Sequence, residues 1–109
     1  MADVLGTFEQ AILLAIVRLG AHAYGRRVLN DLEDRLDREV AAGAVYATLE
    51  RLESKGLATS KLIAGTALRD GRVRRHFVVT AAGVRALNDT RKMTDHIWHG
   101  LTWPLKGRS

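Results

Sequence analysis

The first third of the chain carries apolar residues at helical spacing. They recur every three or four positions along one broad stripe, which contains Phe8, Ile12, Leu13, Ile16, Val17 and Leu19. Thr7 and Gln10 have the spacing of a capping box at the start of this stripe, and Gly20 stands at its end. The pattern predicts a mostly buried helix between Thr7 and Gly20.

Two further helical patterns follow. The first runs from about residue 24 to 36, with apolar side chains four apart at Tyr24, Val28, Leu32 and Leu36. The second lies within residues 41–56, where the core stripe consists of Val45, Leu49 and Leu52. Gly56 suits the left-handed position after a helix, and Leu57 can pack back on Leu52 in a Schellman arrangement.

The period then changes from helix to strand. Residues 57–63 and 73–80 are short runs rich in β-branched residues, with Phe77 and Val79 on one face of the second run and His76 and Val78 on the other. Gly65 and the pair Asp70-Gly71 are turn signals between the runs, so we expect a β-hairpin. Thr80 then N-caps a fourth helix that reaches about His99.

The third helix has an outer face of small side chains. With its core stripe turned inward, Gly43 and Ala47 point outward at its N-terminal half, Tyr46 flanks one side and Ala44 and Arg51 flank the other. Small residues allow a helix to enter a DNA major groove about 12 Å wide. The alternative is that they allow close packing between helices of the protein itself.

The net charge of +5 is concentrated around the hairpin. Six basic residues and one acidic residue lie between Lys55 and Arg75, whereas residues 31–39 hold five acids and two arginines. A basic hairpin directly after a helix-turn-helix predicts a winged helix, whose wing contacts phosphates beside the groove. A solvated surface loop is the alternative explanation for the charge.

Composition excludes several classes of protein. The chain of 109 residues suits one domain, lacks cysteine, and has no apolar run longer than the seven residues Ala11–Val17, far from a membrane span. It begins MADVLG without a basic region, so we expect no signal peptide and a cytoplasmic protein. Neither His22 nor His76 stands beside a nucleophile or carboxylate pair, so we predict no enzyme, no catalytic residue and no cofactor.

Three segments resemble the PadR family of bacterial winged-helix transcriptional regulators. They are HAYG at residues 22–25, GAVYATLERLESKGL at 43–57 and GRVRRHFVVTAAGVRAL at 71–87. The resemblance implies a repressor that binds double-stranded DNA as a homodimer on a twofold-symmetric operator. Tyr46 matches the family's recognition-helix tyrosine, and Gly71 and Arg72 match its wing turn. Residues 41–44 read AAGA, where family members commonly have a hydroxyl residue, proline, glycine and a second hydroxyl residue.

The expected fold is therefore mainly α with a small β-hairpin (α+β), a winged helix-turn-helix followed by a C-terminal dimerisation helix. We expect Arg72 and Arg74 to contact phosphate, and Arg51, Thr48 and DNA shape to determine base preference. The predicted DNA-binding residues are Gly43, Ala44, Tyr46, Ala47, Thr48, Arg51, Lys61, Arg72, Arg74 and Arg75. The alternative function is a winged-helix protein-interaction module that binds an acidic partner through the same basic wing.

The C-terminal part has a second apolar pattern. Spacings of three and four connect Leu87, Thr90, Thr94, Ile97 and Leu101, which predicts an a/d seam for dimerisation. We divide the chain into a winged-helix domain (1–80), a C-terminal dimerisation helix (81–103) and a tail (104–109). The predicted dimer contacts are Leu87, Ile97, Trp98 and Leu101. Packing of this helix back on the first helix is the alternative.

This C-terminal part contains two candidate small-molecule sites. Some members of the resembled family hold flat aromatic effectors between tryptophans at the dimer interface, and Trp98 is a candidate for that role; a plain dimer anchor is the alternative. His96 and His99, with Asp95, have a spacing that can bind a metal ion. Because no cysteine accompanies them, we predict no metal site.

Overall fold

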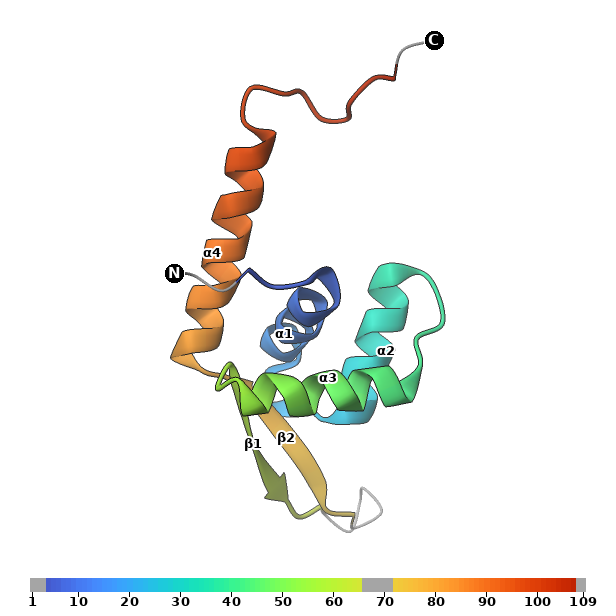
Figure 1. Ribbon diagram of the computed structural model, residues 1–109. Helices are drawn as coiled ribbons and strands as arrows, with labels where there is room; N and C mark the ends of the chain where they lie inside the picture. The colour runs from blue at the N-terminus through green and yellow to red at the C-terminus, as the bar shows by residue number, and fades with distance from the viewer. Residues whose placement is uncertain (1–3, 66–71, 108–109) are drawn as a thin grey trace.

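The computed structural model describes residues 4–65 and 72–107. The chain forms α1 (Thr7–Leu19), a short 3-10 turn η1 (Gly20–His22), α2 (Gly25–Leu36), α3 (Ala42–Ser54), β1 (Ala58–Ile63), β2 (Arg74–Val79) and α4 (Ala81–Trp98) (Figure 1). The order of helices and hairpin is the predicted one, and the winged helix-turn-helix fold is confirmed. No helix in the described part of the chain is long and apolar enough to cross a membrane.

The core lies between the first three helices and is closed by β2. The largest side chains that are fully buried come from all three helices: Ile12, Leu13, Val28, Leu32, Val45, Leu49 and Leu52. Phe77 of β2 adds its ring to the same cluster and is 5% exposed. Because each such side chain contributes about 1.5–3 kcal/mol when buried, this cluster fixes how α2 and α3 are oriented.

The start of α1 differs from the prediction by one residue. The capping box predicted at Thr7 and Gln10 is wrong, because Thr7 is already the first helical residue and Gly6 is the N-cap. The Gly6 N–H instead donates to Glu9 Oε1 over 3.3 Å. The acidic residue three positions after the cap therefore satisfies the free backbone donor.

The end of α3 has the predicted Schellman arrangement. Gly56 has a φ of 75°, its N–H donates to the Glu53 carbonyl over 2.9 Å, and the Leu57 N–H donates to the Leu52 carbonyl over 3.0 Å. These are the two hydrogen bonds that define the motif. Leu57 is buried, so the chain turns directly from α3 into β1.

The hairpin is antiparallel, with a register from Ala58 opposite Val79 to Ile63 opposite Arg74. Phe77 is buried and Val78 is exposed, as the alternating pattern predicted. The turn signal at Asp70-Gly71 lies outside the described residues. The segment before α2 also pairs with β2, because the Phe77 N–H donates to the Ala23 carbonyl over 2.8 Å.

The first half of α4 packs on the body of the protein, and its second half projects away from it (Figure 1). Thr80 caps the helix by accepting a hydrogen bond from the Gly83 N–H, as predicted. Ala86 is buried, and the hydroxyl of buried Thr90 accepts a hydrogen bond from the Leu5 N–H over 3.1 Å. The helix ends at Trp98, with His99 as its C-cap, so the predicted end at about His99 is confirmed.

The predicted a/d seam is consequently divided between two environments. Leu87 and Thr90 pack against the chain's own core, whereas Ile97 and Leu101 are 72% and 59% exposed. Leu101 also lies beyond the helix, after Gly100 with a φ of 87°. The alternative of packing back on the body therefore applies to the first half of α4. Among the described residues, none covers Ile97 in the second half.

Candidate nucleic-acid interface

The outward face of α3 is bare of large side chains at its N-terminal half. Gly43, Ala44 and Ala47 are exposed, and a β-carbon added at Gly43 would have no atom within 4 Å. Within the part of the chain that the structure describes, these small residues therefore do not serve close helix packing. Thr48, which we expected to face DNA, lies on the opposite side and is 3% exposed. Its spacing from Val45 and Leu52 places it in the core stripe.

Tyr46 extends from α3 toward the start of α2. The side chain is half-exposed, and its ring lies so close to Gly25 that a β-carbon there would approach Tyr46 Cε1 to 2.3 Å. Gly25 is thus required for this placement of the ring. The two helices of the helix-turn-helix meet at this contact.

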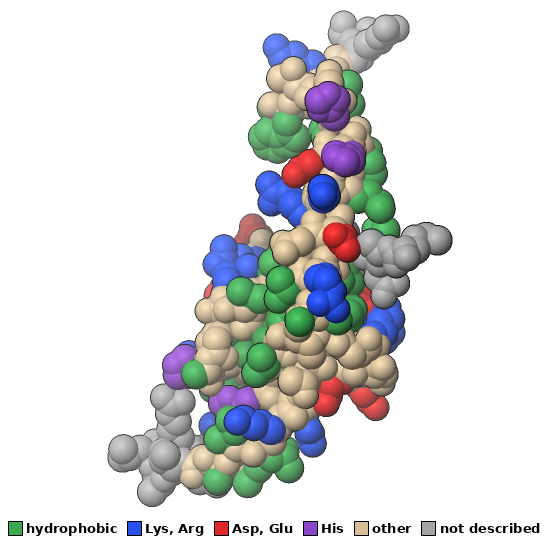
Figure 2. Space-filling model, turned by 90° about the vertical axis from the view of Figure 1, so that its left-hand side faces the viewer, with side chains coloured by type: hydrophobic (Ala, Val, Ile, Leu, Met, Phe, Trp, Pro, Cys, Tyr) green, Lys and Arg blue, Asp and Glu red, His purple; other side chains and the backbone are tan. Residues whose placement is uncertain are grey.

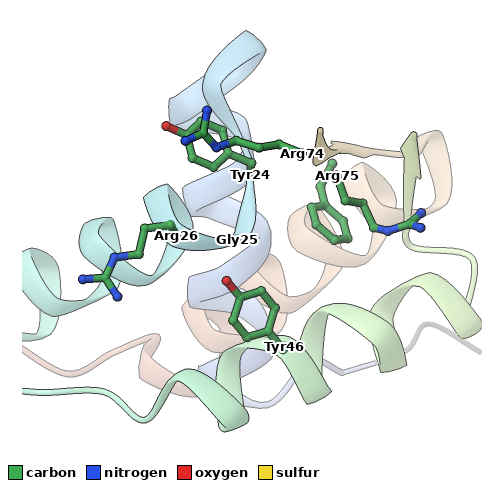
Figure 3. A pocket seen from close by; sticks show the side chains of 7 residues that line it. Tyr24, Gly25, Arg26, Tyr46, Arg74 and Arg75 are labelled. Carbon is green, nitrogen blue, oxygen red and sulfur yellow. The ribbon is translucent and has the colours of Figure 1, made fainter. Parts of the chain in front are cut away.

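A cavity of about 310 Å³ opens between α2, α3 and β2. Its lining combines aromatic rings with three arginines: Tyr24, Gly25, Arg26, Tyr46, Arg74, Arg75 and Phe77 (Figure 3). Tyr24 and Arg26 were not among the predicted DNA-binding residues. The available signal was the pair Arg26-Arg27, which follows directly after the HAYG segment.

The arginines of β2 are held on opposite faces of the strand. The Arg74 guanidinium carbon lies over the Tyr24 ring, 4.7 Å from its centroid. Arg75 donates to Ser60 Oγ over 3.0 Å, and Ser60 in turn donates to Glu53 Oε2 over 2.8 Å. Figure 3 shows the two side chains pointing in opposite directions.

The other two predicted wing contacts, Lys61 on β1 and Arg72 before β2, are exposed. Gly71 lies outside the described residues. Hydrophobic and basic side chains lie together over the hairpin end of the molecule (Figure 2). The structure therefore brings Lys61, Arg72, Arg74 and Arg75 to one hairpin beside α3.

Arg51 is turned toward α1. Its Nε lies 3.6 Å from Glu9 Oε2, and its Nη2 donates to the Thr48 hydroxyl over 3.3 Å. Lys55 donates to the same Glu9 oxygen over 2.9 Å. The hydrogen bond from Lys55 lowers the pKa of the Glu9 carboxyl against the opposing effect of burial, with smaller contributions from the Gly6 N–H and Arg51.

His96, Ile97 and Trp98 lie on the projecting half of α4, at the opposite end of the molecule from the hairpin (Figure 1). Trp98 is 37% exposed, and Ile97 is the more exposed of the two. Figure 2 shows hydrophobic side chains along this projecting part. His96 and His99 are exposed, and the described residues contain no group of three histidine, cysteine or acidic side chains that could hold a metal ion.

A helix-turn-helix with an exposed second helix, followed by a basic two-stranded wing, defines a winged-helix DNA-binding protein. The profile of the Transcriptional regulator PadR-like family matches residues 13–89. The chain belongs to this family, whose members are DNA-binding transcriptional regulators and not enzymes.

Solved structures share the fold. The chain is similar to a PadR-like transcriptional regulator from Bacillus cereus, with 24% identity, 84% of each chain covered and a TM-score of 0.70. It is similar to a PadR-like transcription factor from Bacteroides fragilis, with 22% identity, 84% of each chain covered and a TM-score of 0.68. RosR of H. salinarum shares 26% identity over 90% of this chain and 81% of that chain, with a TM-score of 0.64. No curated protein matches the chain.

Proposed function

We propose that this regulator is a repressor that binds a twofold-symmetric operator as a homodimer and leaves it when a small molecule binds. The observation that carries the DNA contact is the bare, exposed face of α3 beside a hairpin with several arginines. In a dimer, one α3 would enter the major groove at each half-site, about 34 Å from its partner.

The roles of the individual residues follow from where they lie. Gly43, Ala44 and Ala47 let the backbone of α3 approach the groove, and half-exposed Tyr46 reaches its edge. Lys61, Arg72, Arg74 and Arg75 contact phosphates from the wing. These phosphate contacts carry much of the affinity and none of the direct base reading.

Base preference is assigned to Arg51 and to DNA shape. Thr48 is left out because its hydroxyl is buried and already accepts a hydrogen bond from Arg51. Arg51 must exchange its ion pair with Glu9 for a base edge, and its half-exposed side chain leaves room for that movement. A good arginine contact to a base contributes about 1–3 kcal/mol of discrimination.

The dimer is assigned to the projecting half of α4. Met93, Ile97 and Trp98 are all exposed there, and burying such side chains against a second copy is favourable by about 1.5–3 kcal/mol each. Leu101 follows directly in the chain and would extend the contact. Trp98 of two copies would face a shared space, which suits a planar aromatic effector.

In this proposal, the DNA-binding unit extends past residue 80 into the first half of α4. The first half of α4 packs on the winged-helix core through Ala86 and Thr90, so it belongs mechanically to the DNA-binding unit. Residues beyond it form the dimerisation segment and tail. The dimer contact and the wing are thus connected by α4, so a shift of the dimer contact would also move the wing.

The test measures the affinity of the protein for short DNA duplexes taken from the region upstream of its own gene. The measurement is repeated over a series of salt concentrations. We expect one duplex to bind more tightly than random DNA, with affinity that falls as salt rises, and sedimentation to report a dimer. A planar aromatic compound that quenches Trp98 should release the duplex at similar concentrations. Equal affinity for all duplexes would contradict the proposal of a specific operator. Quenching of Trp98 without release of DNA would contradict the proposal of an effector.

A further inference from the structure

One aromatic ring connects the start of α2 with the wing. The Tyr24 backbone forms an isolated antiparallel bridge with His76, and the two rings lie with their centroids 5.5 Å apart. The Arg74 guanidinium carbon lies over the same Tyr24 ring at 4.7 Å from its centroid. Arg74 and His76 are two positions apart and so point from the same face of β2. Tyr24 therefore contacts two neighbouring side chains of that face.

A cation over an aromatic face is attracted to the ring and loses part of its freedom. The N–H donors of a guanidinium lie in its plane, so a ring below that plane leaves their directions outward. Ordering a long arginine side chain otherwise costs up to about 2 kcal/mol of rotamer entropy when it binds. An arginine that is ordered beforehand therefore binds a partner at lower cost.

We propose that Tyr24 is a positioning residue of the DNA interface, which holds Arg74 at the cavity between α2, α3 and β2 for contact with a backbone phosphate. The inference rests on the proposed DNA binding and adds a residue to it. Two further cations, Arg26 and Arg75, line the same cavity. In Figure 3 they point away from one another, on different sides of the cavity, with Arg74 over Tyr24. Cations spread in this way suit the phosphates of a DNA strand better than one compact anion.

The Tyr24 ring can be changed without removing the backbone hydrogen bond of the neighbouring residue Ala23. The hydrogen bond from the Phe77 N–H to the Ala23 carbonyl fixes this segment to β2 without any side chain of Tyr24. Tyr24 is only partly buried, and it is not one of the side chains that form the hydrophobic core cluster. Replacing the ring by an aliphatic side chain should thus remove the cation–π contact with Arg74 and leave the fold intact.

The experiment is a double-mutant cycle between Tyr24 and Arg74, read as DNA affinity over a series of KCl concentrations. The variants are Tyr24→Leu, Tyr24→Met, Tyr24→Phe, Arg74→Ala and the double variant Tyr24→Leu/Arg74→Ala. Arg91→Ala removes a charge from exposed α4 as the matched control. Circular dichroism melts of every variant report whether it folds, and Tyr24→Met replaces Tyr24→Leu if the latter does not.

We expect Arg74→Ala to weaken binding and to lower the salt slope by about one phosphate contact. Tyr24→Leu should weaken binding about two- to five-fold, the effect of one exposed cation–π contact, and shift the slope in the same direction. Tyr24→Phe and Arg91→Ala should resemble the unaltered protein. The double variant should bind as Arg74→Ala does, because Tyr24 acts through Arg74.

Two results would overturn the inference while leaving DNA binding in place. One is a double variant in which the two losses multiply, since Tyr24 would then act independently of Arg74. The other is a Tyr24→Phe variant as weak as Tyr24→Leu, since the hydroxyl and not the ring would then matter. If the unaltered protein shows no salt-dependent binding to any duplex, the proposed function itself fails and the inference fails with it.

Discussion

The ring of Tyr46 occupies the space that a β-carbon of Gly25 would need. Such a carbon would lie 2.3 Å from Cε1 and 2.8 Å from the hydroxyl oxygen of Tyr46. Gly25 begins α2 and Tyr46 lies in α3, so the contact joins the two helices of the helix-turn-helix. The absence of one side chain in α2 thereby sets the direction of an exposed ring in α3.

Gly25→Ala should consequently affect DNA binding more than stability. The added methyl group meets the far end of the Tyr46 side chain, which can rotate at a cost of about 0.5–1.5 kcal/mol. We expect DNA affinity to fall toward that of Tyr46→Ala, with only a small shift of the thermal midpoint. In a Tyr46→Ala background, the same Gly25 substitution should leave affinity unchanged. Wild-type affinity of Gly25→Ala beside a weakened Tyr46→Ala would contradict this.

Gly83 offers a contrasting case, because its neighbour is backbone. A β-carbon there would lie 2.1 Å from the Leu57 carbonyl oxygen and 2.6 Å from Val79 Cγ1. Gly83→Ala should therefore lower the free energy of unfolding by about 1–3 kcal/mol, measured by urea denaturation, because α4 must move off the β1 junction. The control is Gly43→Ala, which meets nothing within 4 Å and should stabilise α3 by about 0.5–1 kcal/mol. Equal effects at both glycines would refute the packing argument.

Local patterns in the sequence were sufficient for the elements and most of their ends. The apolar stripe of α3 and the pair Gly56-Leu57 specify the helix and its Schellman end, because both depend on neighbours within one turn. The alternation of Phe77 and Val78 likewise specifies the faces of β2. These are local relationships, and they need no knowledge of the rest of the fold.

The site was less predictable because its contacts connect distant segments. Arg51 is drawn toward Glu9 of α1, and Arg74 lies over Tyr24. No periodicity within either segment encodes such pairs.

Thr48 is a different case, since its spacing from Val45 marks it as buried. Its hydroxyl led to the prediction of a base contact. Its position on the inward face of α3 buries it instead.

The pairing of Glu9 with Lys55 predicts a pH dependence of stability. The pKa of Glu9 is lowered in the folded protein, chiefly by the Lys55 hydrogen bond. A lowered folded pKa means that the stabilisation is complete above the unfolded pKa, about 4.3, and is lost as pH falls through the folded value. Glu9→Gln should therefore cost about 0.5–1 kcal/mol at pH 7 and progressively less below about pH 4.

Urea denaturation of the unaltered protein and of Glu9→Gln at several pH values measures this difference. Asp95→Asn is the matched control, because Asp95 pairs with Arg91 on the exposed surface of α4. That substitution should change stability little at any pH. A Glu9→Gln cost that stays constant down to pH 3 would mean that the charge of Glu9 does not produce the stabilisation.

The two halves of α4 should respond differently to substitution. Leu87 packs on the core of its own chain, so Leu87→Ala should lower the free energy of unfolding by about 2 kcal/mol. Ile97 is 72% exposed, so Ile97→Glu should leave the fold of one chain unchanged. A dimer held through this end would instead place the new carboxylate in an apolar contact, where an unpaired charge is costly.

Sedimentation velocity separates the two effects. We expect Ile97→Glu to sediment as a folded monomer and to bind its operator weakly, because each half-site contact then stands alone. Leu87→Ala should remain dimeric at temperatures below its reduced midpoint. If Ile97→Glu stays dimeric, the projecting half of α4 is not the interface, and the exposed side chains of Met93 and Trp98 must be explained by another partner.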